Sequence, residues 1–233
     1  MKRFSFSLCL VLCFLASAFC EENPTVLLQK AKAGDAAAQA EIGQLYAIGR
    51  GVEKDSTEAM KWFVKSANQG NAAGEYFLGV MYELGRGGAP RDVPTAITWF
   101  ERAAKQGKVE AQFELARIYD TGRGVPKNPV MAAKYYQDAA AQGQIKAELR
   151  TAQLYETGQG VSQDYTASMK WYLKVADSNS EAQVKSEAQY RIGLFYEKGY
   201  GVPKDRTKAM EWYHKAADLG SGDAEVAIKA LEG

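Results

Sequence analysis

The phrase Ala38-Gln-Ala-Glu-Ile-Gly-Gln-Leu-Tyr46 occurs five times in the chain, with substitutions that preserve its pattern of small and apolar residues. The other four copies span residues 74–82, 111–119, 147–155 and 188–196. Two glycines one residue apart follow each copy, and an aromatic pair comes next, at Trp62-Phe63, Trp99-Phe100, Tyr135-Tyr136, Trp171-Tyr172 and Trp212-Tyr213. Recurrence at a nearly constant interval is typical of a tandem array of one structural unit.

Each unit predicts two helices. Counting the first residue of the phrase as position zero, apolar or small residues fall at positions 0, 4, 7 and 8, the spacing of one helical face. Position 5 is always glycine or alanine, which lets a partner helix approach closely. Asp55 with Glu58, and Asn128 before Pro129, are typical of the start of a second helix. The same capping position holds Asp92, Asp164 and Asp205 in the other units.

The combined pattern of A-x-x-x-L-G-x-x-Y-x-x-G-x-G-V, an acidic cap, W-Y/F-x-K-A-A and a closing glycine resembles the Sel-one-like repeat, a branch of the tetratricopeptide superfamily. The resemblance covers roughly residues 36–220 and implies an all-α fold, a right-handed α-solenoid of about five helix-turn-helix repeats with terminal capping helices. We expect the repeat domain to span residues 36–222. Its five repeats are expected at 36–70, 71–107, 108–143, 144–186 and 187–220.

The ends and one junction depart from the period. Residues 21–35 predict an N-terminal capping helix and residues 223–233 a C-terminal one, because a terminal repeat must cover its apolar face. The stretch 177–186 is longer than the period allows, which predicts a longer helix or a longer turn there. Thr151 stands where leucine is usual, so we expect a weaker core in the fourth repeat.

Residues 1–20 have the composition of a secretory signal peptide. Lys2 and Arg3 precede a mostly apolar run, and small residues precede Glu21. The pattern predicts a periplasmic or secreted protein, with cleavage after Ala18 or after Cys20. Lipidation at Cys20 is the less favoured alternative, because Phe19 occupies the position where a small residue is required. Since all three cysteines lie in this leader, the rest of the chain has no disulfide.

Charge and motifs argue against several function classes. Lys+Arg is 29 and Asp+Glu is 28, so no basic field indicates nucleic acid, and we expect no integral membrane span after signal cleavage. His214 is the only histidine, so no zinc or serine–histidine constellation is expected, and no cofactor or metal is predicted. Some members of the resembled family act on β-lactams, but S-x-x-K and K-T-G are absent here. We therefore expect a protein that is not an enzyme.

The surface of the first helices is the candidate site, because the resemblance implies that these helices line the concave face and bind partners there. Positions 2, 6 and 9 of the phrase fall within one arc opposite the core positions. The candidates are Tyr76, Val80, Glu83, Phe113, Arg117, Asp120, Leu149, Gln153, Glu156, Tyr190, Leu194 and Glu197. An apolar stripe beside a row of carboxylates suits a protein ligand with apolar and basic residues. The alternative is that curvature packs position 2 between repeats and leaves the carboxylates as a solvated face.

These features predict an exported protein that binds another protein through its concave face. The resemblance implies several bacterial roles, including restraint of sensor kinases, engagement of host proteins and immunity against secreted toxins. We favour an inhibitor or immunity protein that neutralises a toxin, or a regulator of a sensor or other envelope protein. An envelope assembly scaffold with a second surface at 177–186 is the main alternative, and a β-lactam or cell-wall enzyme is the third.

Overall fold

A computed structural model of the chain describes residues 23–232, and these residues form twelve α-helices and no strand. The helices are α1 (Pro24–Lys32), α2 (Ala36–Ile48), α3 (Ser56–Asn68), α4 (Ala72–Leu84), α5 (Val93–Lys105), α6 (Val109–Thr121), α7 (Pro129–Ala141), α8 (Ile145–Thr157), α9 (Tyr165–Ala176), α10 (Ala182–Lys198), α11 (Arg206–Asp218) and α12 (Gly222–Glu232). The expected all-α fold is confirmed. The predicted signal peptide lies outside the described residues, and no helix within them is long and apolar enough to cross a membrane.

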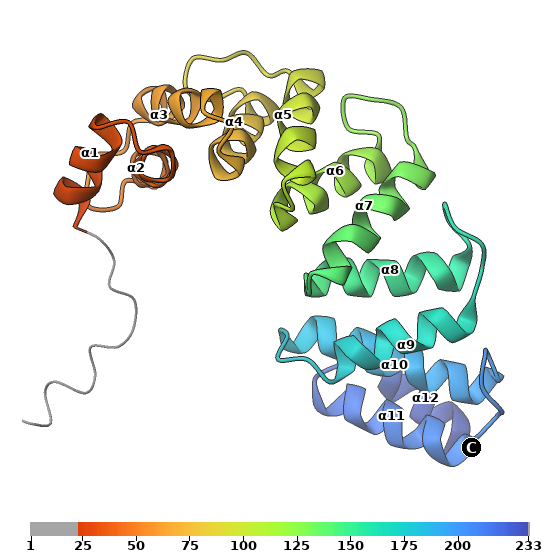
Figure 1. Cartoon of the computed structure of the whole chain (residues 1–233). Helices are drawn as coiled ribbons and strands as arrows, with labels where there is room; N and C mark the ends of the chain where they lie inside the picture. Colours follow the sequence, from red (N-terminus) through yellow and green to blue (C-terminus); the bar gives the residue numbers. More distant parts are fainter. Residues whose placement is uncertain (1–22, 233) are drawn as a thin grey trace, which may run out of the picture.

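The helices follow one another along a curved path, with α1 at one end and α12 at the other (Figure 1). Each even-numbered helix from α2 to α10 packs against the odd-numbered helix that follows it, and each odd-numbered helix packs against the next even-numbered one. We call these the first and second helices of repeats one to five. Stacking of successive helix pairs confirms the predicted α-solenoid.

Side-chain caps set where the helices begin. The Asp55 carboxylate accepts hydrogen bonds from the backbone N–H groups of Thr57 and Glu58, at 2.8 and 3.0 Å. The Asn128 side chain accepts one from the N–H of Met131, two residues after the proline that opens α7. Because such bonds satisfy donors that have no partner inside the helix, they fix the start of each second helix as the sequence predicted.

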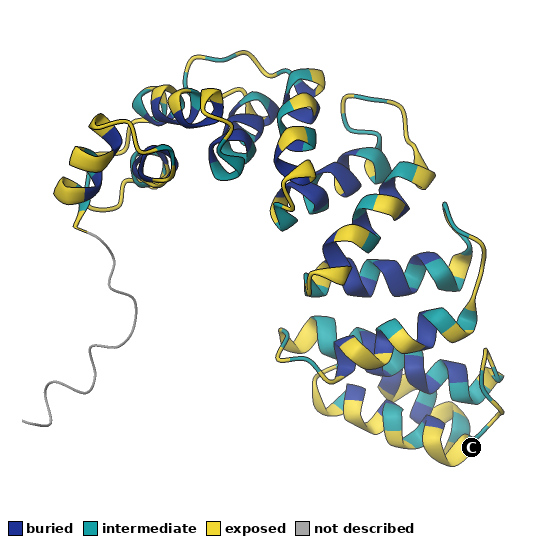
Figure 2. Cartoon of the chain, in the orientation of Figure 1, coloured by how far each residue is buried: buried dark blue, intermediate teal, exposed yellow. Residues whose placement is uncertain are grey.

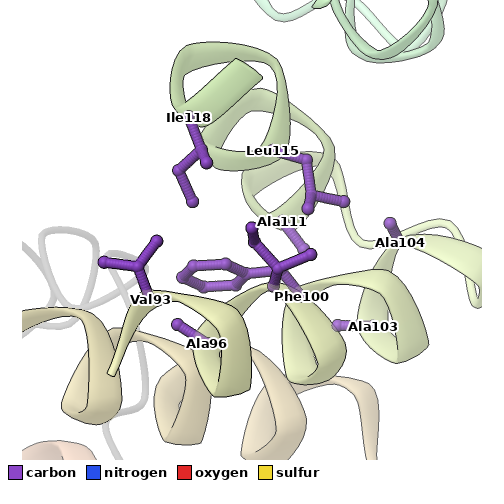
Figure 3. Packing of buried hydrophobic residues seen from close by; sticks show 9 residues of the cluster. Val93, Ala96, Phe100, Ala103, Ala104, Ala111, Leu115 and Ile118 are labelled. Carbon is purple, nitrogen blue, oxygen red and sulfur yellow. The ribbon is translucent and has the colours of Figure 1, made fainter. Parts of the chain in front are cut away.

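Each second helix carries a buried ring that joins two repeats. Phe100 of α5 is fully buried and packs with Leu115 and Ile118 of α6 (Figure 3). The ring of Tyr76 in α4 also contacts Phe100, with 5.8 Å between ring centroids. Along the stack, buried residues lie where neighbouring helices face one another (Figure 2). The core is therefore continuous from repeat to repeat, and each repeat depends on its neighbours for burial.

The small residue at position 5 makes room for the ring of the same repeat. A Cβ added to Gly79 would lie 2.7 Å from the Phe100 ring and 3.2 Å from the Ala96 carbonyl oxygen. The 2.7 Å distance is shorter than real Cβ contacts, so the close packing of Phe100 favours glycine there despite its cost of about 1 kcal/mol inside a helix. The sequence-based explanation of this position is confirmed.

The extra residues between the fourth and fifth repeats lengthen a helix. α10 has 17 residues, whereas α8 has 13, and the added residues lie at the N-terminal end of α10. The remaining residues form a turn between Asp177 and Glu181 that ends α9 and begins α10. The junction therefore differs from the others at the C-terminal end of α9 and the N-terminal end of α10.

Helices cover both ends of the stack. Leu27 and Ala31 of α1 are buried against α2, where they join Ala38 and Ile42 in one apolar cluster. At the other end, Ile228 of α12 is buried against α11. Both terminal helices shield an apolar face that would otherwise meet water.

Thr151 is a polar residue inside the core of repeat four. Its side chain is fully buried, and its hydroxyl has no hydrogen-bond partner within residues 23–232. Since an unpaired buried hydroxyl costs about 1–3 kcal/mol, we expect Thr151→Val to raise the unfolding free energy by about 1–2 kcal/mol. The melting temperature should rise by about 2–8 °C.

A matched substitution separates this effect from a general preference for valine. The Thr157 side chain is exposed and its hydroxyl donates to the Gln153 carbonyl at 2.9 Å. Thr157→Val should change stability by less than about 0.5 kcal/mol. Equal shifts for the two variants in thermal unfolding followed by circular dichroism would contradict the buried-hydroxyl explanation.

Candidate partner-binding face

The first helices lie along the inside of the solenoid. α2 contacts α4 and α8 contacts α10, although each pair is separated in sequence by a second helix. Polar side chains also link them directly, because the Gln153 amide of α8 donates to Glu187 of α10 at 2.7 Å. In a curved stack the inner elements come closest together, so the first helices form the concave surface, which we call the first-helix face.

The side chains at position 2 of the phrase lie on this face, but one side of each packs against core residues. Tyr190 lies 5.6 Å from Tyr213 between ring centroids, and Phe113 lies 5.8 Å from Tyr136 in an edge-to-face arrangement. Leu149 is 9% exposed and belongs to the core between repeats four and five. These residues therefore pack against the core as well as forming part of the surface.

Tyrosines of the second helices hold the carboxylates at position 9. The Tyr172 hydroxyl donates to Glu156 at 2.5 Å, and the Tyr213 hydroxyl donates to Glu197 at 2.6 Å. The equivalent bond in repeat three runs from Tyr136 to Asp120 at 3.3 Å. The sequence contains this signal, because the second aromatic is tyrosine in the three repeats with these pairs and phenylalanine in the first two.

The same carboxylates join one repeat to the next. Arg150 of α8 pairs with Asp120 of α6 at 3.0 Å, and Arg191 of α10 pairs with Glu156 of α8 at 3.1 Å. In repeat two, where the ring is Phe100 and has no hydroxyl, Glu83 pairs instead with Arg123. The predicted row of carboxylates is thus largely engaged within the protein, and its members cannot all offer charge to a ligand.

Burial and hydrogen bonding move the pKa values of these groups in different directions. Burial raises the pKa of Glu83 above its ordinary value, and the Arg123 guanidinium opposes that rise. Hydrogen bonds from Lys198 and then from Tyr213 hold the pKa of Glu197 below its ordinary value. Burial raises the pKa of Tyr136 to about 12. The tyrosine therefore remains a hydrogen-bond donor at neutral pH.

Among the twelve candidate residues, only Arg117 is exposed, and it pairs with Glu114 at 3.1 Å. Glu83 and Leu149 are buried, while the other nine are partly exposed, namely Tyr76, Val80, Phe113, Asp120, Gln153, Glu156, Tyr190, Leu194 and Glu197. Packing of the helices therefore covers much of the surface of these side chains. Their role in binding stays a prediction.

A concavity lies on the first-helix face between repeats three and four. It encloses about 240 Å³ and is lined by Phe113, Arg117, Tyr136, Lys146, Leu149, Arg150 and Gln153. Four of these residues were candidates from the sequence. Lys146 and Arg150 were not, because they fall outside the arc of positions 2, 6 and 9. Although Arg150 pairs with Asp120, the two side chains bring positive charge to a rim where the sequence pattern suggested an acidic surface. We call this concavity, with its lining, the central groove.

Metal-ligating side chains do not cluster in the part of the chain that the structure describes. Residues 23–232 contain no group of three or more His, Cys, Asp or Glu side chains arranged to hold a metal ion. His214 is exposed on α11. The central groove therefore remains the site on the first-helix face with the most specific combination of shape and charge.

Comparisons with known proteins agree with this architecture. The Sel1 repeat family model matches five segments, residues 36–71, 72–108, 109–144, 145–180 and 186–221. A Sel1 repeat protein from Oxalobacter formigenes has a similar crystal structure, with a TM-score of 0.73 and 32% identity over 86% of this chain and 80% of that one.

A second similar structure is c5321, a protective antigen present in uropathogenic Escherichia coli strains that displays an SLR fold. It has a TM-score of 0.66 and 29% identity over 91% of this chain, which spans about half (52%) of that protein. No curated protein matches the chain. Five tandem Sel1 repeats form a protein-interaction scaffold, and the chain belongs to the Sel1 repeat family.

Proposed function

We propose that this chain is an exported binding module whose protein partner docks on the first-helix face, centred on the central groove. The observation that carries the proposal is the meeting of Phe113 and Leu149 with exposed basic side chains in one concavity. An apolar side chain of the partner would pack against Phe113, and an acidic group beside it would reach Lys146. Pairing of an apolar anchor with a charged rim is typical of protein interfaces.

The size of the groove favours a protein over a small molecule. Pockets that enclose small molecules usually have volumes of about 300–1,000 Å³, and the central groove has about 240 Å³. A curved face built from five repeats instead offers an extended surface on which the groove is one anchor point. The twelve candidate residues from the sequence lie along that surface, and those still partly exposed would contribute contacts around the anchor.

The form of the partnership follows from the curvature. A concave face that encloses a convex surface of its partner suits inhibition, so we favour an inhibitor or immunity protein acting on a toxin, or a regulator of a sensor or envelope component. The basic and apolar composition of residues 1–20 supports export to the periplasm. An assembly scaffold remains the second candidate, since the junction at 177–186 departs from the other repeats.

The test is affinity capture from the envelope fraction of the native host with three baits. One bait is the unchanged chain from residue 21 onward, and the second carries Arg117→Glu with Lys146→Glu. Both side chains are exposed, so the fold should be retained. We expect the second bait to recover at least tenfold less partner, because reversed rim charges oppose an acidic group.

The third bait is a charge-matched control. Lys134→Glu with Lys170→Glu changes two exposed lysines on second helices by the same charge. It should capture the partner as well as the unchanged chain does. Equal recovery by all three baits would place the binding site elsewhere, and recovery by none would contradict a protein-binding function.

A further inference from the structure

A buried polar residue recurs at position 1 of every phrase. These residues are Gln39, Glu75, Gln112, Glu148 and Gln189, and all are nearly inaccessible to solvent. In the first three repeats, a glutamine at the end of the second helix donates its amide to this residue. The distances are 2.8 Å for Gln69 to Gln39, 2.7 Å for Gln106 to Glu75 and 2.8 Å for Gln142 to Gln112.

The fifth repeat lacks this partner. Leu219 occupies the C-terminal cap of α11, where glutamine ends the second helices of repeats one to three. The side chain of Gln189 is 6% exposed, and its carbonyl oxygen has no hydrogen-bond partner among the described residues. Because buried acceptors are rarely left unpaired, this one requires an explanation.

The inserted residues remove the usual partner of the amide nitrogen as well. In repeats one and three, the position 1 glutamine donates to a carbonyl eight residues earlier, from Gln112 to Ala104 at 3.4 Å and from Gln39 to Ala31 at 3.0 Å. Eight residues before Gln189 is Glu181, which caps the start of α10 and lies outside the preceding helix. The Gln189 amide therefore lacks both contacts that its counterparts use.

A cavity of about 910 Å³ lies at this junction. It is bounded by the start of α8, the end of α9, the inserted turn, the start of α10 and one side of α11, and Gln189 is part of its lining. It shares no residue with the central groove. Its volume lies in the range of pockets that enclose several side chains or a small ligand.

The lining combines three ammonium groups and apolar surface with two carboxylates, those of Glu148 and Asp177. Lys174 pairs with Glu148 at 2.6 Å, and Lys185 donates to the Ser178 carbonyl at 3.2 Å. Lys215 lies 4.1 Å from the centre of the Trp212 ring. Within residues 23–232, neither Lys185 nor Lys215 has a carboxylate at ion-pair distance. Besides Trp212, the apolar lining includes Ile145 and Leu173, and Leu173 is 40% exposed.

We propose that this junction cavity binds an acidic segment of a partner protein, as a second binding surface separate from the central groove. The primary amide of Gln189 can donate to and accept from a peptide group of the segment. Carboxylates of the segment would lie between Lys185 and Lys215, and a neighbouring apolar side chain would pack on Trp212. Charge complementarity selects an acidic occupant, and the paired donor and acceptor of the amide select a peptide.

A stability comparison tests whether the Gln189 amide serves a ligand or the fold. Gln189→Leu removes a buried amide without fold partners, so the melting temperature should stay the same or rise. Gln112→Leu is the matched control, because it removes two hydrogen bonds at the equivalent position of repeat three and should lower the melting temperature by about 3–6 °C. An equal loss in both variants would assign the Gln189 amide to the fold and overturn the proposal.

Peptide selection tests the ligand. A random dodecapeptide phage library is selected on the whole chain and counter-selected on the Lys185→Gln, Lys215→Gln variant. We expect the retained peptides to combine carboxylates with an aromatic or aliphatic residue, and their binding to weaken with added salt. Loss of all selected peptides in the counter-selection step, or enrichment of peptides without carboxylates, would overturn the proposal.

Synthetic copies of the selected peptides then locate the contact. Their dissociation constant should rise at least tenfold in Gln189→Leu and stay unchanged in the Arg117→Glu, Lys146→Glu variant, which alters only the central groove. Amidating the peptide terminus and replacing Asp by Asn distinguish a terminal carboxylate from a side-chain carboxylate. Unchanged affinity in Gln189→Leu would overturn the proposal and leave the proposed function of the first-helix face untouched.

Discussion

Replacing Tyr172 with alanine is expected to lower the free energy of unfolding by about 3–5 kcal/mol, the usual cost of removing a large buried aromatic side chain. Tyr172 is fully buried, and its ring meets Phe195 of the next repeat edge-to-face at 5.7 Å. Its hydroxyl also donates to Glu156 at 2.5 Å. The substitution therefore removes an apolar contact and a charge-assisted hydrogen bond at the same point.

The loss should be local, because each repeat of a solenoid is stabilised by its immediate neighbours. Hydrogen exchange measured by mass spectrometry should show faster exchange in α8 to α11 and little change in α2 to α5. Tyr172→Phe is the control, since it keeps the ring and removes only the hydroxyl, and it should cost about 1–3 kcal/mol. Uniform acceleration along the whole chain in Tyr172→Ala would contradict nearest-neighbour coupling.

Gly160→Ala is expected to destabilise the protein by about 3 kcal/mol, from left-handed backbone strain and steric overlap together. Gly160 has a φ of 76° and lies in the loop after α8. A Cβ at this position would overlap the carbonyl group of Pro129, at the start of α7 in the preceding repeat. Relief of that overlap requires the two repeats to separate, so the melting temperature should fall by about 6–12 °C.

Gly143→Ala separates backbone strain from this packing effect. Gly143 also has a left-handed φ, of 84°, but an added Cβ would meet nothing within 4 Å. Only the conformational cost of about 1 kcal/mol remains, which predicts a fall of about 2–4 °C. Thermal unfolding of both variants, followed by circular dichroism, gives the comparison. Equal losses of stability in Gly160→Ala and Gly143→Ala would show that Gly160 does not pack against the preceding repeat.

The repeat architecture could be predicted from the sequence because its determinants are local. The spacing of apolar residues within the phrase defines each first helix, and caps such as Asp55 and Asn128 act over two or three residues. The longer α10 was one of two outcomes expected for residues 177–186. Local chemistry alone did not decide between a longer helix and a longer turn, because that choice depends on how α10 packs against α9.

The surface chemistry was harder to predict because it depends on pairs far apart in the sequence. Glu156 appears solvated when α8 is considered alone, yet Tyr172 and Arg191 both contact it from other helices. The basic rim of the central groove arises because Lys146 and Arg150 approach Arg117 across two repeats. A helical arc calculated for one helix cannot include these neighbours, so it overstated the acidity of the first-helix face.

The most direct test of binding at the first-helix face is hydrogen exchange of this chain, measured with and without the captured partner. If the first-helix face binds the partner, exchange should slow in α6 and α8, which supply most of the central groove, and not in the exposed sides of α7 and α9. Substituting Arg117→Glu with Lys146→Glu should abolish that footprint. Protection confined to the second helices, or to the loops that contain the glycine pairs, would contradict binding at the first-helix face.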